Sequence, residues 1–318
     1  MLFPFIFLSL GLALVIKGAD YLIDGASSLA KHMHVSEIVI GLTIVAFGTS
    51  APELIINIFS SIAGKNDLVL GNILGANMLN ILFTMGIAGL IYPLDFNSNS
   101  IRKEIPFSLL ATLVFFVLAN DRFIFNTASN RLSRIDGLIL LSLLGFFFYY
   151  TFGLSKIKSL SSNEIKEYSL LKSWIFVIIG FAFLFVGGKV VVNYAVIIAR
   201  KLQVSEKLIG LTVLSIGTTL PELTTTVVAA VKKRSDLIIG NLLGSNIFNL
   251  LLIMGISTVI SPISYDTVFN FDVAVLGLGT VFLLISIIIF KPRKLDRREA
   301  LVLLIFYIVY MVLIISRK

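Results

Sequence analysis

The sequence predicts an all-α membrane protein with ten transmembrane helices, arranged as two five-helix repeats of opposite topology. Three observations support this prediction. The 318 residues are 57% hydrophobic, whereas soluble domains are about 45–50% apolar. Charged residues make up only 14% of the chain and cluster between long apolar runs. Two polar motifs of the first half recur in the second half at a constant separation of 169 positions.

The predicted helices follow from length, because a membrane-crossing helix needs about 20 predominantly apolar residues. The candidate spans are residues 2–25, 36–63, 67–92, 103–120, 131–152, 172–200, 205–232, 236–262, 268–290 and 298–316. The two repeats are then residues 1–152 and 172–318. Residues 153–171 form the linker, which is rich in Ser and Lys and too short for a folded soluble domain.

The orientation follows from the span count and from the loop charges. Five spans is an odd number, so the second repeat enters the membrane from the opposite side, as an inverted repeat. The predicted loops carry 15 Lys and Arg on one side and 9 on the other. Because cytoplasmic loops carry the excess of positive charge, we expect both termini outside the cell membrane and a cytoplasmic linker. The net charge of +8 is thus an orientation signal, and no nucleic-acid partner is expected.

The motif of residues 41–53 places polar residues in the middle of an apolar span. Gly48, Thr49, Ser50, Pro52 and Glu53 interrupt a run that is apolar on both sides. Proline removes a backbone donor and breaks or bends a helix. A carboxylate in hydrocarbon costs several kcal/mol without a partner or water. The pattern therefore predicts a helix broken near the membrane midplane to create a polar site.

The repetition strengthens this interpretation. Residues 41–53 match residues 210–222 at 7 of 13 positions, and residues 71–80 match residues 240–249 at 6 of 10 positions. A single separation for both matches indicates a duplicated half-chain. The alternative for an isolated intramembrane glutamate, snorkelling or pairing with a lysine, is disfavoured when the same broken-helix motif occurs twice.

Glu53 and Glu222 are the central candidates for binding a metal ion. Facing each other near the midplane, they would supply two negative charges to a hard divalent cation. Calcium prefers six to eight oxygen ligands from carboxylates, carbonyls and waters. The other candidate donors are the hydroxyls of Thr49, Ser50, Thr218 and Thr219 and the carbonyls around Ala46 and Ser215, which the helix breaks are expected to free for calcium or sodium.

Asn80 and Asn249 each close a Gly-Asn-x-x-Gly-x-Asn-x-x-Asn run in the helix after the glutamate. An amide oxygen adds a ligand without adding charge, so we assign both asparagines to the ion site. The alternative is that they only join helices by hydrogen bonds. The glycines of the runs, spaced by four, are expected to serve close helix packing.

These motifs resemble those of the sodium/calcium exchanger family, within the calcium/cation antiporter superfamily. The resemblance is carried by residues 48–53 with 71–80, and by residues 217–222 with 240–249. It implies a four-helix core across which the long first and sixth helices slide. It further implies a central calcium site of Glu53, Glu222, Thr49 and Thr218, completed by Asn80 and Asn249. The flanking sodium sites would use the carbonyls of Ala46 and Ser215 and a serine such as Ser245.

The chain departs from the family pattern at Ala76, where a serine is usual, while its counterpart Ser245 is present. Sodium is the expected counter-ion, and a proton/calcium antiporter is the alternative that Ala76 leaves open. The linker has no room for soluble calcium-sensing domains, so we expect a minimal prokaryotic exchanger that works as a monomer without a resident cofactor. An enzyme, such as a membrane-embedded hydrolase, is disfavoured because the chain has no cysteine and each glutamate has a symmetric twin.

Overall fold

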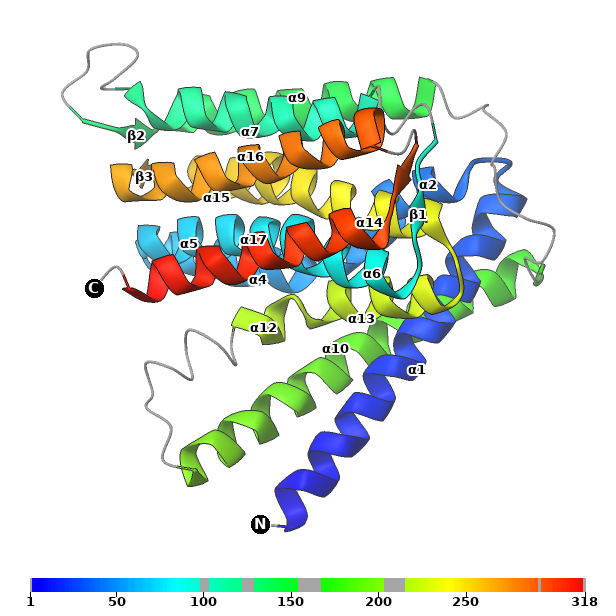
Figure 1. Cartoon of the computed structure of the whole chain (residues 1–318). Helices are drawn as coiled ribbons and strands as arrows, with labels where there is room; N and C mark the ends of the chain where they lie inside the picture. Colours follow the sequence, from blue (N-terminus) through cyan, green and yellow to red (C-terminus); the bar gives the residue numbers. More distant parts are fainter. Residues whose placement is uncertain are drawn as a thin grey trace.

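The computed structural model describes residues 2–97, 103–121, 129–153, 167–202, 215–290 and 293–316, which are almost entirely helical (Figure 1). The first half contains α1 (Leu2–His32), α2 (Glu37–Ile40), the π-helical turn η1 (Gly41–Val45), α3 (Ala46–Thr49), α4 (Ala51–Ile62), α5 (Asn66–Met78), the π-helical turn η2 (Leu79–Thr84), α6 (Met85–Ile91), β1 (Leu94–Asp95), α7 (Ile105–Ala119), β2 (Arg131–Leu132) and α9 (Arg134–Gly153).

The second half repeats this order. It contains α10 (Leu170–Lys201), α12 (Ser215–Thr218), α13 (Leu220–Val231), α14 (Ser235–Ile247), the π-helical turn η5 (Phe248–Ile253), α15 (Met254–Ile260), β3 (Ile263–Ser264), the 3-10 turn η6 (Thr267–Phe269), α16 (Asn270–Ile285), the π-helical turn η7 (Ser286–Phe290), β4 (Lys294–Leu295) and α17 (Arg297–Ser316). From α3 to α6, every element bound recurs in α12 to α15 at the separation found in the sequence.

Fewer than the ten predicted helices are long and apolar enough to count as membrane spans among the described residues. Among the described residues, six helices are long and apolar enough to cross a membrane, or seven if the bent pair of residues 37–49 and 51–62 is one span. Two further apolar helices, α7 and α13, are short. Residues 205–214 of the predicted seventh span and residues 154–166 of the predicted linker lie outside the described residues.

Both predicted helix breaks are present and have the same backbone geometry. Ser50 separates α3 from α4 with φ −82° and ψ 3°, and Thr219 separates α12 from α13 with φ −91° and ψ 5°. The first break bends the helix pair by 48°. Pro52 and Pro221 follow at the second helical position, where a missing N–H leaves no helical acceptor unsatisfied.

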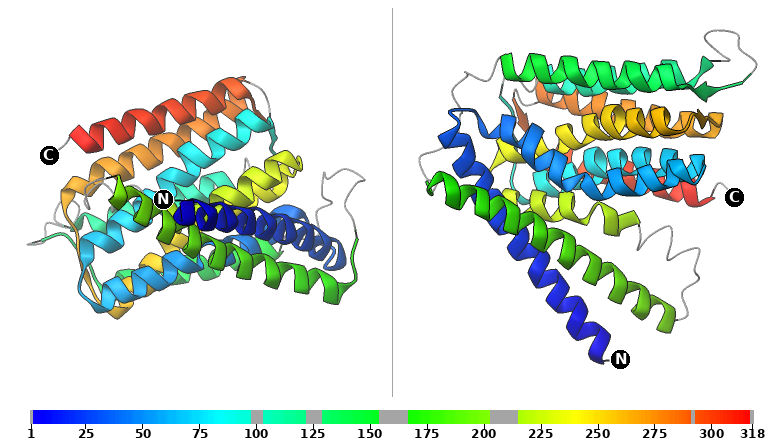
Figure 2. Two further views of the ribbon diagram at one scale, coloured as in Figure 1. Left: turned by 90° about the horizontal axis from the view of Figure 1, so that it is seen from below. Right: turned by 180° about the vertical axis from the view of Figure 1, so that it is seen from behind.

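Two long helices stand apart from the rest. α1 and α10 pack against each other and run obliquely away from the stack of other helices (Figures 1 and 2). Glycines permit their close approach: a Cβ on Gly18 would lie 2.8 Å from the carbonyl oxygen of Gly180, and a Cβ on Gly180 would lie 2.7 Å from the backbone nitrogen of Leu22.

An ionic cluster fastens α1 to the end of α13. Lys232 Nζ lies 2.6 Å from Asp20 Oδ1 and 2.5 Å from Asp24 Oδ1, and it donates to the backbone oxygen of Asp20 at 3.2 Å. We call Lys232, Asp20 and Asp24 the ionic latch. The second half does not reproduce it, because Ala63, Lys189 and Asn193 occupy the corresponding positions.

The short strands pair across the two halves. β1 of the first half pairs antiparallel with β4 of the second, and β2 of the first half pairs antiparallel with β3 of the second. The registers join Leu94 to Leu295 and Leu132 to Ile263. All four leucine and isoleucine side chains are fully buried, so the paired strands join the two halves through buried apolar contacts.

Candidate functional site

Two buried carboxylates occupy the first turns of the helices that follow the breaks. Glu53 is the third residue of α4 and Glu222 is the third residue of α13, and each is 1% exposed. The first turn of a helix carries a partial positive charge that favours a carboxylate. The two matched breaks therefore deliver one carboxylate each to the interior of the protein.

The hydroxyls of each half face the carboxylate of the other half. Ser50 Oγ donates a 3.3 Å hydrogen bond to Glu222 Oε1, and Thr49 lies beside the same carboxylate. Thr218 lies beside Glu53. The carboxylates of Glu53 and Glu222 are close enough to interact electrostatically. Two buried like charges repel strongly in a low dielectric, so this pair favours a cation as its partner.

Asn80 and Asn249 are buried at matched places, each the second residue of a π-helical turn. Such turns often occur at functional sites, where they redirect a side chain. η2, with Asn80, contacts the Glu222 helix α13, and η5, with Asn249, contacts the Glu53 helix α4. Each asparagine therefore lies on an element that contacts the glutamate helix of the opposite half, just as the hydroxyls of one half lie beside the carboxylate of the other.

Several buried oxygen atoms of these residues have no protein partner. They are Glu53 Oε1 and Oε2, Glu222 Oε2, Asn80 Oδ1, Asn249 Oδ1 and Ser245 Oγ. Buried polar atoms normally have a hydrogen-bond partner, so this concentration of acceptors suits a bound cation or water. The described residues contain no cluster of three or more His, Asp and Glu side chains. A cation here would be held by two carboxylates together with neutral oxygens, a ligand set typical of calcium.

The predicted backbone ligand at Ala46 differs from expectation. The bend comes after Ser50, and the carbonyl oxygen of Ala46 still accepts a 3.0 Å bond from Ser50 N and a 3.3 Å bond from Thr49 Oγ1. The break therefore does not free this carbonyl in the conformation described. The first bond continues the helix, whereas Thr49 can rotate its hydroxyl away.

The remaining predicted residues lie on the same elements. Ser245 and Ala76 occupy matched positions in α14 and α5 and are both buried. Thr219 forms the second break and is 3% exposed. Ser215 begins α12, and its side chain lies outside the described atoms.

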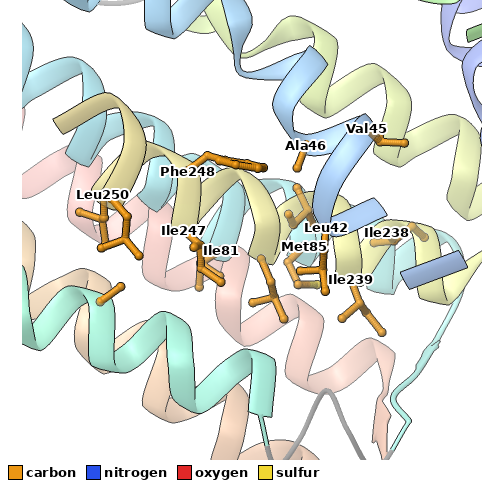
Figure 3. Close-up of a cluster of buried hydrophobic side chains, with 14 of the residues drawn as sticks. Leu42, Val45, Ala46, Ile81, Met85, Ile238, Ile239, Ile247, Phe248 and Leu250 are labelled. Atoms are coloured by element: carbon orange, nitrogen blue, oxygen red, sulfur yellow. The ribbon is translucent and has the colours of Figure 1, made fainter. Parts of the chain in front are cut away.

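Apolar side chains from both halves pack beside these polar groups. Figure 3 shows Ala46 beside Phe248 and Ile81 just below Ile247, whereas Val45 points away from them. All five belong to the buried core. The fit is close where η1 crosses α14: a Cβ on Gly244 would lie 2.7 Å from Ala46 Cβ, and a Cβ on Gly240 would lie 2.5 Å from the oxygen of Ile38. This confirms the predicted packing role of the second-half glycines, whereas a Cβ on Gly71 or Gly75 would meet no atom within 4 Å among the described residues.

Three further asparagines contact the site residues and were absent from the predicted set. Asn241 Oδ1 accepts a 3.1 Å hydrogen bond from Thr49 Oγ1. Asn77 and Asn246 bind the amides of Asn249 and Asn80. All three lie in the repeated asparagine runs, so their recurrence in both halves was the available signal.

Fold and site together define a multi-pass membrane protein with paired carboxylates buried between two interrupted helices. The family model for the sodium/calcium exchanger protein matches residues 3–153 and 172–316. The chain therefore belongs to the sodium/calcium exchanger family. This confirms the resemblance found in the sequence and the predicted function class, a sodium/calcium antiporter of minimal prokaryotic type.

Individual relatives agree over nearly the whole chain. CaxA of Alkalimonas amylolytica is 34% identical, and the alignment covers 99% of this chain and all of CaxA. The sodium/calcium exchanger MaX1 of Methanosarcina acetivorans is 30% identical over 98% of each chain. A structure of the sodium-calcium exchanger NCX_Mj soaked with Na⁺ and Sr²⁺ superposes with a TM-score of 0.84 at 28% identity, covering 97% of each chain.

Proposed function

We propose that the chain exchanges Ca²⁺ for Na⁺ by alternating access, and that both ions use the site between Glu53 and Glu222. The observation that carries the proposal is the pair of buried carboxylates, with each one facing hydroxyls of the opposite half. Two carboxylates balance the charge of one calcium ion. Neutral oxygens from both halves can complete its coordination shell.

The proposed calcium ligands are the carboxylates and the neutral oxygens nearest to them. Glu53 and Glu222 supply the charge. The neutral ligands are Thr49, Thr218, Asn80 and Asn249. Support comes from the burial of both glutamates and from the partnerless oxygens of Glu53, Asn80 and Asn249.

Sodium is proposed to bind at flanking positions that share the same carboxylates. The candidate ligands there are the carbonyls of Ala46 and Ser215 and the hydroxyls of Ser50, Thr219 and Ser245. Calcium and a full set of sodium ions then compete for one pair of charges, so they occupy the site alternately. An empty site with two uncompensated carboxylates is costly to carry across the membrane, and this cost couples the two fluxes.

The proposed transport cycle uses ten spans as two inverted repeats of residues 1–152 and 172–318. α1 and α10, which pack together and lean away from the other helices, would slide across the core that contains α4 and α13. The loop charges support a cell-membrane orientation with both termini outside and the linker inside. Because each half completes the site of the other, a monomer contains every proposed ligand.

Ion uptake into proteoliposomes tests the function directly. Calcium uptake is driven either by an outward sodium gradient or by a pH gradient, with Glu53→Gln as the inactive control. We expect sodium-driven uptake that is lost in Glu53→Gln. Equal sodium-driven uptake by both proteins would refute the proposed site.

A proton-coupled antiporter is the second candidate, and Ala76 is the observation that favours it. The first half lacks the hydroxyl that Ser245 supplies in the second half, so one flanking sodium position has one ligand fewer. Uptake driven by the pH gradient alone would preserve the carboxylate site and assign the chain to proton coupling.

A further inference from the structure

Four asparagines form a hydrogen-bonded group across the two halves. Asn249 Nδ2 donates a 2.9 Å bond to Asn77 Oδ1, and Asn80 Nδ2 donates a 3.2 Å bond to Asn246 Oδ1. Asn77 and Asn246 also donate their own amide hydrogens to each other's backbone oxygens, at 3.3 and 3.4 Å. Each of the four side chains is at most 1% exposed.

The pattern separates the two ends of each site amide. The Nδ2 groups of Asn80 and Asn249 are engaged, whereas their Oδ1 atoms have no protein partner. A side-chain amide has nearly the same shape after a half-turn, so packing alone cannot select which end faces an ion. A neighbouring hydrogen-bond acceptor does select the orientation of the amide, because it binds the NH₂ group and so fixes the position of the oxygen.

We propose that Asn77 and Asn246 are positioning residues, which we call the amide clamp, that hold the carbonyl oxygens of Asn249 and Asn80 toward the transported cation. This inference rests on the proposed function and adds two residues to its site. Without the clamp, either amide can turn and present its NH₂ group, which repels a cation.

The clamp works across the duplication. Asn77 in α5 orients a ligand in η5, and Asn246 in α14 orients a ligand in η2. The reciprocal bonds to backbone oxygens fix the two clamp residues relative to each other. The orientation of one site asparagine therefore depends on the helix that carries the other one.

The test measures calcium binding through the rise in Tm that calcium produces in the purified, detergent-solubilised protein. We expect Asn77→Ala and Asn246→Ala to weaken apparent calcium affinity by about 10- to 100-fold, the usual cost of losing a residue that supports a metal ligand. In proteoliposomes, the half-saturating calcium concentration should rise while the maximal exchange rate is largely retained.

Double mutants distinguish positioning from general packing. If Asn77 acts through Asn249, then Asn77→Ala has no further effect on calcium affinity in an Asn249→Ala background, but keeps its full effect with Asn80→Ala. The reverse pattern is expected for Asn246. Additive losses in all four combinations would overturn the proposal, and so would unchanged affinity in both single variants.

The chain offers a matched control. Asn120 and Asn270 form another amide pair, partly buried, with bonds of 3.0 and 2.9 Å, that joins the end of α7 to α16. Asn120→Ala should lower Tm without calcium but leave the calcium-dependent rise unchanged. Glu53→Gln separates the two levels of failure: if it also keeps the full calcium response, the proposed site itself is wrong, whereas if it loses the response and Asn77→Ala does not, only the clamp is wrong.

Discussion

Matched positions in the two halves can be compared residue by residue, because a constant separation relates them. At the centre the halves agree: Glu53 corresponds to Glu222, Thr49 to Thr218, and Asn80 to Asn249. Around the centre they differ. Ala76 in the first half corresponds to Ser245 in the second, and the ionic latch has no counterpart. The residues proposed to bind the ion are thus present in both halves, whereas their surroundings differ.

The largest difference lies along the two helices that lead away from the glutamates. α4 packs against α15, and α13 packs against α6, so the two pairs are equivalent. The first pair buries four hydroxyls where the second pair has only small apolar residues. The hydroxyls belong to Ser60, Ser61, Ser257 and Thr258, and the matched residues are Ala229, Ala230, Ala88 and Gly89.

Three of these hydroxyls have no protein partner: those of Ser61, Ser257 and Thr258. Buried hydroxyls without partners are usually satisfied by water. At these four positions the pair α4 and α15 therefore offers more places for water than the pair α13 and α6, although α13 also buries two hydroxyls without a protein partner, those of Thr225 and Thr226. An exchanger built from two similar halves can in this way acquire unequal faces.

The largest effect is expected from removing either central charge. Glu53→Gln and Glu222→Gln should each abolish calcium exchange, because both carboxylates are proposed to coordinate the ion directly, and such a ligand contributes more than the roughly 10- to 100-fold typical of a supporting residue. Calcium flux into proteoliposomes is the measurement. Glu167→Gln, at an exposed position, is the control and should behave as the unmodified protein. Strongly unequal losses of calcium flux in the two glutamate variants would contradict the functional equivalence of the two halves.

A smaller effect is expected from changing Ser245 and Ala76, the matched residues at the proposed flanking sodium positions. Ser245→Ala removes one proposed neutral ligand and should raise the half-saturating sodium concentration by about 3- to 10-fold, the equivalent of roughly one hydrogen bond. Ala76→Ser adds the missing hydroxyl to the first half and should lower it. Sodium-dependent calcium efflux measures both. If Ala76→Ser has no effect on sodium dependence, the site at that end is not a sodium site.

The ionic latch should bias the position of α1 by a few-fold. Its side chains are 25–39% exposed, so the pairing contributes about 0.2–1 kcal/mol after solvent screening. Because the chain has no cysteine, single cysteines at the matched positions Asn57 and Thr226 can report access to the site from each side. Lys232→Ala should change the ratio of their labelling rates about two- to five-fold.

Lys189→Ala provides the control for the latch. This exposed lysine lies in α10 at the position that matches Asp20. Its removal should leave the labelling ratio unchanged. A latch variant with the same ratio as Lys189→Ala would show that α1 is held by packing alone.

The smallest effect is expected from the hydroxyls beside α4. Ser61→Ala should leave Tm unchanged, because we expect water to satisfy this hydroxyl, and should slow exchange by less than about two-fold. The matched change Ala230→Ser places a hydroxyl at a buried alanine and should lower Tm, since an unsatisfied buried hydroxyl costs about 1–3 kcal/mol. A clear rise in Tm for Ser61→Ala would mean that the Ser61 hydroxyl is not hydrated.

The two helix breaks and the buried polar residues beside them could be predicted from the sequence, because each leaves a local chemical pattern. A proline beside a carboxylate in an apolar span is unusual, and its recurrence in both halves disfavours the alternative that each glutamate only snorkels or pairs with a lysine. The bounds of α5 and α14, and of their π-helical turns, repeat as the duplication requires. The exchanger family followed from the same residues.

The contacts between the halves could not be predicted in this way. A constant separation identifies which residues correspond, but it does not say that Ser50 donates to Glu222 or that Asn77 holds Asn249. The Ala46 carbonyl keeps its backbone donor for a related reason: a proline shows that a helix bends, but the exact residue decides which carbonyl loses its donor. The number of spans is equally sensitive, because α7 and α13 are short helices.

The crossed strands have a consequence for how the protein is made. β1 leaves the ribosome early, but its partner β4 is synthesised only near the end of the chain. Domains that fold during synthesis usually complete their N-terminal part first, yet here the loop that carries β1 must wait, with unpaired backbone groups, until almost all other helices have been inserted. We therefore expect biogenesis to end with a closing step, in which β4 and α17 arrive and β1 gains its partner, after β2 and β3 have already joined the two halves.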